Sequence, residues 1–139
     1  MGGAELVVDG EPVAFSERMA YKGMMLSGVP NSAFTVGYTN SSWTLKADLV
    51  SEYVCRILNY MDAGGYTVQV PRADPAMERH ALLDFGAGYI QRSIDELPKQ
   101  GAAWPWRLRM NYVADVLSIR HGALADSAME FRRPHAKPD

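Results

Sequence analysis

Apolar and polar positions recur with helical spacing over one long stretch, about Trp43–Met61, and this pattern predicts an amphipathic helix. The apolar stripe comprises Leu45, Leu49, Val50, Tyr53, Val54, Ile57, Leu58 and Met61. The opposite face carries Lys46, Asp48, Glu52, Arg56, Asn59 and Asp62. Gly64–Gly65 supplies a C-terminal stop. Ahead of the helix, the pattern predicts a short apolar strand at Phe34–Val36 and a polar turn at Gly37–Ser42.

The N-terminal part of the chain predicts a β-hairpin. Leu6–Val8 and Val13–Phe15 flank Asp9–Gly10, a pair that accepts the positive φ angles of a tight turn. Pro12 is expected at the start or edge of the second strand, where a missing donor costs little. Gly23–Leu26 is a second possible strand, and Gly28–Asn31 has the composition of a turn.

The C-terminal half reads as short elements joined by loops. Thr67–Val70 predicts a strand that Pro71 ends, and Arg72–His80 predicts a polar linker. Tyr89–Leu97 predicts a short helix. Met110–Ile119 favours a helix, but its β-branched residues leave a strand open. The basic tail is expected to be a frayed, solvated end; it comprises Arg132, Arg133, His135 and Lys137.

Composition predicts one globular unit and excludes several classes of protein. The chain has 139 residues, of which 47% are hydrophobic and 22% charged, with a net charge of -2. That balance gives no electrostatic footprint for nucleic acid. No apolar run approaches the roughly 18 residues of a transmembrane span. The three histidines are scattered without ligand spacing, so no metal site is expected.

Single helix residues add two expectations. Glu52 and Arg56 are spaced for an i,i+4 ion pair in the favourable order. Cys55 is the only cysteine, so an internal disulfide is excluded, and its place beside Val54 predicts an inert buried thiol. A chain without disulfides fits a reducing bacterial-type cytoplasm.

The turn before the long helix is the first candidate site. Gly37 permits a close backbone approach, and four residues here can each cap a helix, more than one helix needs: Asn40, Ser41, Ser42 and Thr44. A strand that turns into a helix N-terminus presents N–H groups and a positive dipole end to an anionic or electron-rich ligand. Spacing alone leaves both readings open, simple capping and ligand contact.

Two apolar motifs are weaker candidates. Trp104–Pro105–Trp106 is either a stacking platform or, more in keeping with the flanking Gly101 and Arg107, an anchor for a loop. Met24–Met25 either lines an apolar pocket or fills the core. No nucleophile elbow, catalytic triad or glycine-rich phosphate loop occurs in the sequence.

Three contiguous segments carry a resemblance to a known family: Ala20–Asp62, Ser93–Gly101 and Pro105–Val116. Together they resemble the C-terminal region of flavin-dependent Baeyer–Villiger monooxygenases, and most closely those of the ethionamide-activating type. The resemblance implies use of FAD and NADPH, with O2 as the oxygen source. It implies small organic substrates: ketones into which oxygen is inserted, or sulfides and thioamides that are oxidised. A cytoplasmic protein is implied, with peripheral membrane contact left open.

The resemblance also assigns cofactor-binding residues. The turn and the start of the helix are implied to lie near the pyrimidine edge and ribityl chain of FAD, through Gly37, Tyr38, Thr39, Asn40, Ser41, Ser42, Trp43 and Thr44. Asn40 or Ser41 would donate hydrogen bonds to the flavin, and Trp43 would pack against the flavin ring. A helix N-terminus there would stabilise the negative charge of reduced flavin by roughly 0.3–2 kcal/mol.

The implied fold class is α/β, as the C-terminal fragment of a flavoprotein with two dinucleotide-binding domains. Residues 1–20 would form a hairpin leading out of an upstream region, 21–70 the last strand, turn and helix of the FAD domain, and 71–139 an extension packed on it with a disordered end. Phe34–Val36 would belong to a parallel sheet whose other strands lie outside the chain.

The family's glycine-rich loops and catalytic arginine would also lie upstream, so no catalytic residue is expected here. The isolated chain should neither hold FAD tightly nor turn over substrate, and the upstream part of the enzyme is its natural partner. Two alternatives stay open. One is a non-enzymatic remnant or interaction module without cofactor, and the other is a binder of small apolar ligands that uses Met24, Met25, Trp104 and Trp106.

Overall fold

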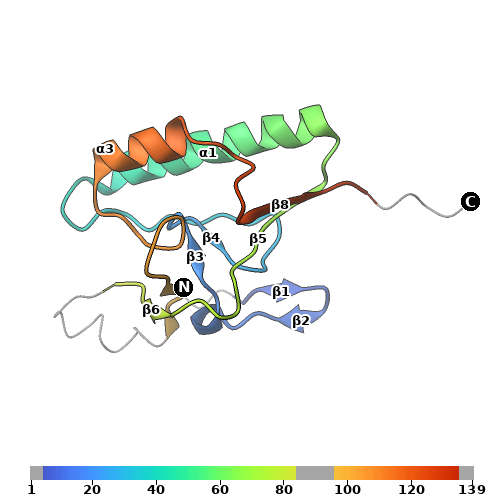
Figure 1. The fold of residues 1–139 in the computed structure, drawn as a ribbon, viewed down its shortest axis with the longest axis horizontal. Helices are drawn as coiled ribbons and strands as arrows, with labels where there is room; N and C mark the ends of the chain where they lie inside the picture. The colour runs from blue at the N-terminus through green and yellow to red at the C-terminus, as the bar shows by residue number, and fades with distance from the viewer. Residues whose placement is uncertain (1–4, 84–95, 135–139) are drawn as a thin grey trace, which may run out of the picture.

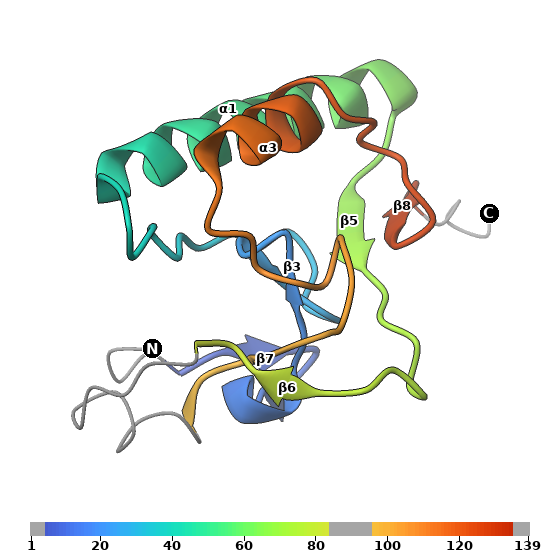
Figure 2. The same cartoon turned by 60° about the vertical axis from the view of Figure 1, so that its left-hand side comes forward.

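The computed structural model describes residues 5–83 and 96–134, which form two layers. The upper layer in Figure 1 holds the long helix α1 (Trp43–Gly64) and, beside it, the short helix α3 (Tyr112–Asp115). The helix α3 continues as a π-helical turn, η3 (Val116–Arg120). Figure 2 shows the strands below both helices.

Among the described residues, the strands form four separate antiparallel pairs. They are β1 (Val7–Val8) with β2 (Glu11–Pro12), β3 (Ala20–Tyr21) with β4 (Met25–Leu26), β5 (Val68–Pro71) with β8 (Met129–Arg132), and β6 (His80–Ala81) with β7 (Lys99–Gln100). A 3-10 turn, η1 (Phe15–Glu17), follows the first pair. The chain therefore mixes helices and strands as expected, but its described part contains no parallel sheet.

The predicted strand at Phe34–Val36 does not form. These residues have no regular structure, and their backbone makes one hydrogen bond within the described residues, from the Phe34 N–H to the Met24 carbonyl (2.8 Å). A strand exists only where a neighbouring strand accepts and donates its hydrogen bonds. No such neighbour is present in the part of the chain that the structure describes.

The long helix confirms the main prediction and corrects its details. It begins at Trp43 as predicted and ends at Gly64, beyond the predicted Met61, and Gly65 with its left-handed φ of 65° forms the C-cap. The buried stripe is rotated relative to the predicted one: Lys46 is buried, whereas Leu58 is 54% exposed. Cys55 is exposed, not buried, because it points away from the face that carries Tyr53.

The first hairpin has the predicted turn but shifted strands. Asp9 and Gly10 both have positive φ, 53° and 86°. Because this turn has two residues, pairing starts directly beside it, and Val8 faces Glu11. The predicted second strand, Val13–Phe15, is wrong, since its last residue already begins η1.

Elements of the C-terminal half settle two further expectations. Met110–Ile119 is helical, not a strand, and Asn111 caps it by accepting the Ala114 N–H (3.0 Å). Arg132 is not frayed, because it lies in β8 and pairs with Val68 of β5. The helix predicted at Tyr89–Leu97 lies almost wholly outside the described residues, as does the end of the tail beyond residue 134.

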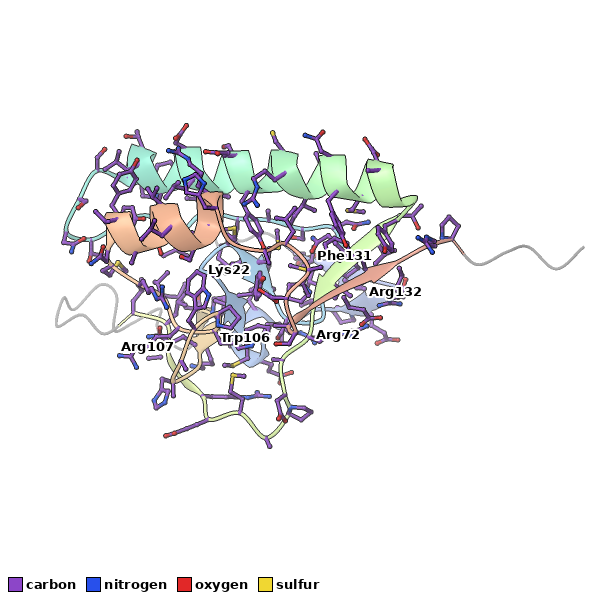
Figure 3. All side chains as sticks on the ribbon, turned by 45° about the horizontal axis from the view of Figure 1, so that its top comes forward. Lys22, Arg72, Trp106, Arg107, Phe131 and Arg132 are labelled. Carbon is purple, nitrogen blue, oxygen red and sulfur yellow. The ribbon has the colours of Figure 1, made fainter. Side chains whose placement is uncertain are left out.

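The core lies between α1 and the strands. Met24 and Met25 are 0% and 1% exposed, so core filling is their main role. Trp106 is buried edge-on against Tyr21, with ring centroids 5.5 Å apart, which confirms that this loop is anchored on the body of the protein. Figure 3 shows Trp106 in the interior and Arg107 at the edge of the molecule.

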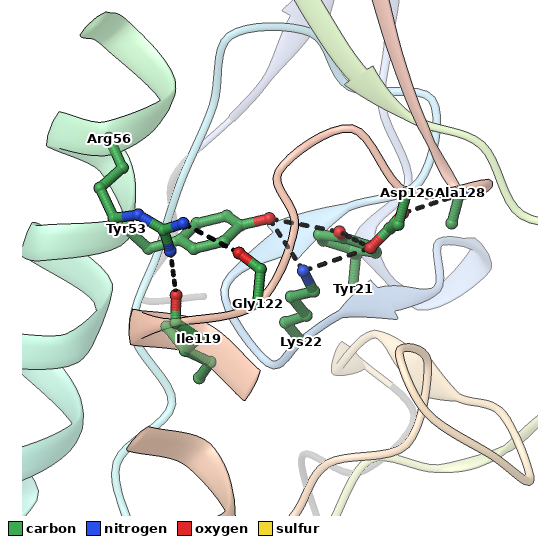
Figure 4. Close-up of polar contacts among 8 residues, drawn as sticks. All are labelled: Tyr21, Lys22, Tyr53, Arg56, Ile119, Gly122, Asp126 and Ala128. Carbon is green, nitrogen blue, oxygen red and sulfur yellow. Dashed lines mark hydrogen bonds and ion pairs between the residues drawn. The ribbon is translucent and has the colours of Figure 1, made fainter. Parts of the chain in front are cut away.

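A polar network crosses this core, and Figure 4 shows its contacts. Lys22 Nζ donates to the Tyr53 hydroxyl (3.0 Å) and pairs with Asp126 (3.2 Å). The Tyr21 hydroxyl donates to the same carboxylate (2.6 Å). Three segments far apart in the sequence are thereby joined by one buried cation.

The predicted Glu52–Arg56 pair is replaced by contacts with the segment around η3. Arg56 donates to the carbonyls of Ile119 (2.6 Å) and Gly122 (2.8 Å). Glu52 accepts from Arg120 Nε (2.6 Å). The local pair is worth only a few tenths of a kcal/mol, so these longer-range partners displace it.

We expect Asp126→Asn to lower the free energy of unfolding by about 1–3 kcal/mol, because Lys22 is 2% exposed and loses its only anionic partner among the described residues. Asp62→Asn is the matched control, since Asp62 is exposed and its side chain makes no contact of this kind in the described structure. Urea unfolding measures both. Equal effects of the two substitutions would contradict this role of the network.

Candidate functional site

The eight residues of the candidate site form the connection between the strand layer and the start of α1 (Figure 1). Tyr38 is buried (7% exposed) and Gly37 is half-buried. The other six are exposed: Thr39, Asn40, Ser41, Ser42, Trp43 and Thr44. The structure thus brings the predicted residues together as one turn with one residue rooted in the interior.

The N-terminus of α1 lacks the side-chain cap that its sequence could supply. Ser42 occupies the N-cap position without a capping hydrogen bond, and its hydroxyl instead contacts the Thr44 hydroxyl (2.7 Å). Of the first backbone donors, Leu45 N–H bonds the Ser42 carbonyl (3.2 Å). The N–H groups of Trp43 and Thr44 have no acceptor among the described residues, so a long helix presents free donors at its positive end.

Gly37 lies directly against the side chain of Trp43. A Cβ at Gly37 would overlap the Trp43 indole, so only glycine lets the ring lie against the turn. Trp43 is still 56% exposed as a residue, and its ring covers the turn from outside. An exposed ring held in this way offers a flat apolar surface beside the free helix donors.

Asn40 holds the turn to the second helix. Its Nδ2 donates to the Met110 carbonyl (2.9 Å), just before the Asn111 that caps α3. Its amide is therefore part of the scaffold, and one donor is already used. Ser41 makes no side-chain hydrogen bond within the described residues.

Beneath the turn lies a buried group that the sequence did not indicate: Tyr38, Lys46 and Asp115. Lys46 Nζ and the Tyr38 hydroxyl both donate to Asp115 Oδ2 at 2.7 Å, and the two charged side chains are 1% and 0% exposed. Burial lowers the pKa of Lys46, against the opposing effect of the carboxylate. Burial, and then the hydrogen bond to Asp115, raises the pKa of Tyr38.

One sequence signal could have found this group. Asp115 is a single acid inside the apolar run from Tyr112 to Ile119, where an unpaired charge would be costly. The sequence could not have identified Lys46 as the partner of Asp115. Lys46 is 69 residues away and lies on a helix face that was predicted to be polar. Their contact depends on how α1 and α3 pack.

A separate open groove of about 440 Å³ lies between α1 and the segment that follows β4. Its lining is mostly apolar: Met25, Asn31, Ser32, Ala33, Val54, Ile57, Leu58, Met61, Asp62, Tyr66, Thr67 and Gln69. Of the four residues considered for an apolar-ligand site, only Met25 lines it. Met24 and Trp106 are core residues, and the ring of Trp104 contacts the cationic groups of Lys22 and Arg109. The structure does not assemble those four into a site.

Two further findings concern what the described residues could hold. Residues 5–83 and 96–134 contain no cluster of histidine, cysteine or acidic side chains suited to a metal ion. In the same residues, no helix combines the length and apolarity of a membrane span.

Comparison with known proteins identifies the class: the chain is a relative of the C-terminal region of FAD-containing monooxygenases. Over 96% of its length it is 56% identical to the FAD-containing monooxygenase EthA of Mycobacterium tuberculosis, and over 97% it is 48% identical to EthA of Mycolicibacterium smegmatis. It is also 38% identical over 96% of its length to the probable FAD-binding monooxygenase AlmA of an Acinetobacter species.

The chain spans 28% of the length of the EthA proteins and 27% of AlmA. Neither a protein-family profile nor a solved structure matches it. The resemblance drawn from the sequence is therefore confirmed for the EthA-type monooxygenases and for their C-terminal region.

We expect Lys46→Met to lower the free energy of unfolding by about 3–5 kcal/mol, because it leaves the Asp115 carboxylate buried without its cation. Adding Asp115→Asn should restore at least half of the loss, since the amide oxygen still accepts the Tyr38 hydroxyl and no charge remains. Chemical unfolding of the single and double variants measures this. A double variant no more stable than Lys46→Met would contradict it.

The buried phenols of Tyr38 and Tyr21 predict that the free energy of unfolding depends on pH. Their pKa values are raised, that of Tyr38 by burial and Asp115, and that of Tyr21 by burial, Tyr53 and Asp126. Each phenol ionises more readily in the unfolded chain, so its stabilisation is complete below pH about 10 and is lost as the pH rises further. The lowered pKa of Lys46 acts in the opposite direction, adding stability as pH approaches its ordinary value.

Comparing Tyr38→Phe with the unsubstituted chain isolates the contribution of the Tyr38 phenol to this pH dependence, because Lys46 is present in both. Between pH about 9 and 11, the unsubstituted chain should lose more of its unfolding free energy than the variant. Urea unfolding at a series of pH values measures the two slopes. Parallel slopes would show that the Tyr38 phenol does not contribute.

Proposed function

We propose that the chain forms the C-terminal part of an FAD- and NADPH-dependent monooxygenase that inserts oxygen into ketones or oxidises sulfides and thioamides. The relatives' names support the FAD-containing monooxygenase class. The observation that carries the assignment of a site is the uncapped start of α1, which offers free N–H groups beside the exposed Trp43. The three-part division at residues 1–20, 21–70 and 71–139 belongs to the same proposal.

The described residues fit one edge of a flavin rather than the whole cofactor. The free donors of Trp43 and Thr44 suit the pyrimidine edge, where negative charge gathers on reduction. The Trp43 indole suits the flat face of the ring, and Ser41 has an uncommitted hydroxyl. Bound FAD, reduced by NADPH, would supply the reaction with O2.

The roles of this chain's residues follow from their contacts. Trp43 and the helix donors would orient the ring and exclude water from its edge. Asn40 would keep the turn in place through Met110, and Tyr38 through Asp115. None of these side chains is proposed to react. Phosphate binding and catalysis would come from a polypeptide corresponding to the remaining length of the relatives, in a cytoplasmic enzyme.

A chimera tests this function. The matched C-terminal segment of Mycobacterium tuberculosis EthA is replaced by this chain, and FAD content and substrate-dependent NADPH oxidation are measured. We expect a yellow, active chimera, and an isolated chain that retains no FAD. An inactive, colourless but folded chimera would overturn the proposal, and a yellow isolated chain would overturn the claim that the chain does not hold FAD alone.

Within the chimera, Trp43→Ala should weaken FAD retention at least tenfold, because the wall of the proposed site is removed. Tyr60→Ala is the matched control, since Tyr60 is another exposed aromatic residue of α1, 37% exposed. Absorbance of the bound flavin after gel filtration measures both. Equal flavin content in the two variants would remove Trp43 from the site.

A further inference from the structure

We infer that the pocket between η1, the end of β4 and the segment after β5 binds the phosphate group of a small soluble phosphate ester. The pocket has a volume of about 220 Å³. The charged residues of its lining are the arginines Arg18, Arg72 and Arg79 and the acids Glu17 and Asp74. It shares no residue with the candidate turn at 37–44, so the inference does not depend on the proposed cofactor site.

The guanidinium group of Arg18 has no counter-ion among the described residues. Arg18 is half-buried, its Nε is closed to solvent without an acceptor, and it forms no ion pair in this part of the chain. Because arginine stays charged at every physiological pH, it cannot escape the cost of burial by losing its proton. A buried donor without an acceptor and a charge without a counter-ion both lower stability. An anion in the pocket would supply the acceptor and the opposite charge together.

The other two arginines add donors to the same pocket. Arg72 donates through Nε to Glu130 (2.6 Å), and its two terminal nitrogens have no partner among the described residues. Arg79 donates through one Nη to the Glu17 carbonyl (3.3 Å), which holds its side chain against η1. Within residues 5–83 and 96–134, the carboxylates of Glu17 and Asp74 form no ion pair with any of the three arginines. The pocket is therefore positively charged overall.

The backbone around the pocket fixes the position of these groups. The Arg18 N–H donates to the Phe15 carbonyl (3.1 Å), and the Arg18 carbonyl accepts the Lys99 N–H (2.8 Å). Gly28, also in the lining, donates its N–H to the Pro71 carbonyl (2.8 Å). Gly28 has a φ of 72°, and a Cβ there would lie 3.1 Å from Arg18 Nη1, so glycine leaves room for the guanidinium group. Donors that are already held in place lose less entropy when a ligand binds.

The donors favour a phosphate over a carboxylate. Guanidinium groups bind both anions through paired N–H groups, but a phosphate ester offers three acceptor oxygens and a charge of about -1.5 to -2. Ser27 adds a hydroxyl group whose oxygen accepts the Met19 N–H (2.9 Å) and whose proton has no acceptor among the described residues. The exposed acids Glu17 and Asp74 would repel an anionic membrane surface, so a soluble ester is the favoured ligand.

Titration of the full chain with inorganic phosphate and with glycerol 3-phosphate tests the inference. Calorimetry measures binding, with potassium chloride at the same ionic strength as the reference. We expect one site with a dissociation constant of about 1 mM or tighter. Arg18→Gln should weaken binding at least tenfold, because it removes the guanidinium group that lacks a counter-ion. The variant should fold normally, since no ion pair of the described residues is lost, and urea unfolding without phosphate checks this.

Arg107→Gln is the matched control, because Arg107 is exposed and does not line the pocket. It removes the same charge and should leave phosphate binding unchanged. Equal weakening by the two substitutions would mean that phosphate responds only to the overall charge, and the inference would be wrong. It would also be wrong if Arg18→Gln bound phosphate as tightly as the unsubstituted chain, or if no binding exceeded the chloride reference.

Further titrations distinguish the classes of ligand. Acetate that binds as tightly as phosphate would overturn the assignment to a phosphate group. Binding of inorganic phosphate without glycerol 3-phosphate would show that the pocket does not admit an ester. Vesicles of phosphatidylcholine with phosphatidic acid test a lipid headgroup. A chain that sediments with these vesicles, but not with phosphatidylcholine alone, and does not bind glycerol 3-phosphate would contradict a soluble ligand.

Discussion

The buried contact between Lys46 Nζ and Asp115 Oδ2 determines how the two helices sit together. The side chains are 1% and 0% exposed and their atoms are 2.7 Å apart, so neither charge is compensated unless α1 and α3 keep one relative position. Tyr38 donates to the same oxygen and therefore shares this constraint. The first turns of α1, the helix α3 and the candidate turn behave as a single unit as a result.

A second buried charge, that of Lys22, fixes the position of the strands relative to α1 in the same way. Its ammonium group is held by Tyr53 of α1 and by Asp126, while the Tyr21 hydroxyl reaches that carboxylate from 105 residues away in the sequence. Packing alone tolerates small sliding of helices, whereas charges that need particular partners do not. These two buried cations, together with the Asn40 contact to Met110, make the position of the turn definite although most of its residues are exposed.

Sequence reasoning succeeded where local signals are sufficient. The start of α1, its glycine end and the Asp9–Gly10 turn follow from periodicity and backbone preference, and the structure has all three. It failed where the outcome depends on distant partners. Burial of Lys46 requires Asp115, and Arg56 bonds carbonyls around η3 instead of Glu52. For the candidate site, the turn before α1 could be located from the sequence and its cofactor role stays a prediction, whereas the buried pair that supports the turn could not be predicted.

The satisfied and unsatisfied groups are not distributed evenly around α1. On the side facing α3 and β3, the buried ammonium groups of Lys22 and Lys46 each have a carboxylate partner, although Asp115 Oδ1 has no hydrogen bond within the described residues. At its N-terminus the donors of Trp43 and Thr44 are free, and along its other flank the groove leaves Leu58 exposed. The free donors of Trp43 and Thr44 and the exposed apolar surface around Leu58 therefore both lie on α1, the helix on which the proposed cofactor site rests.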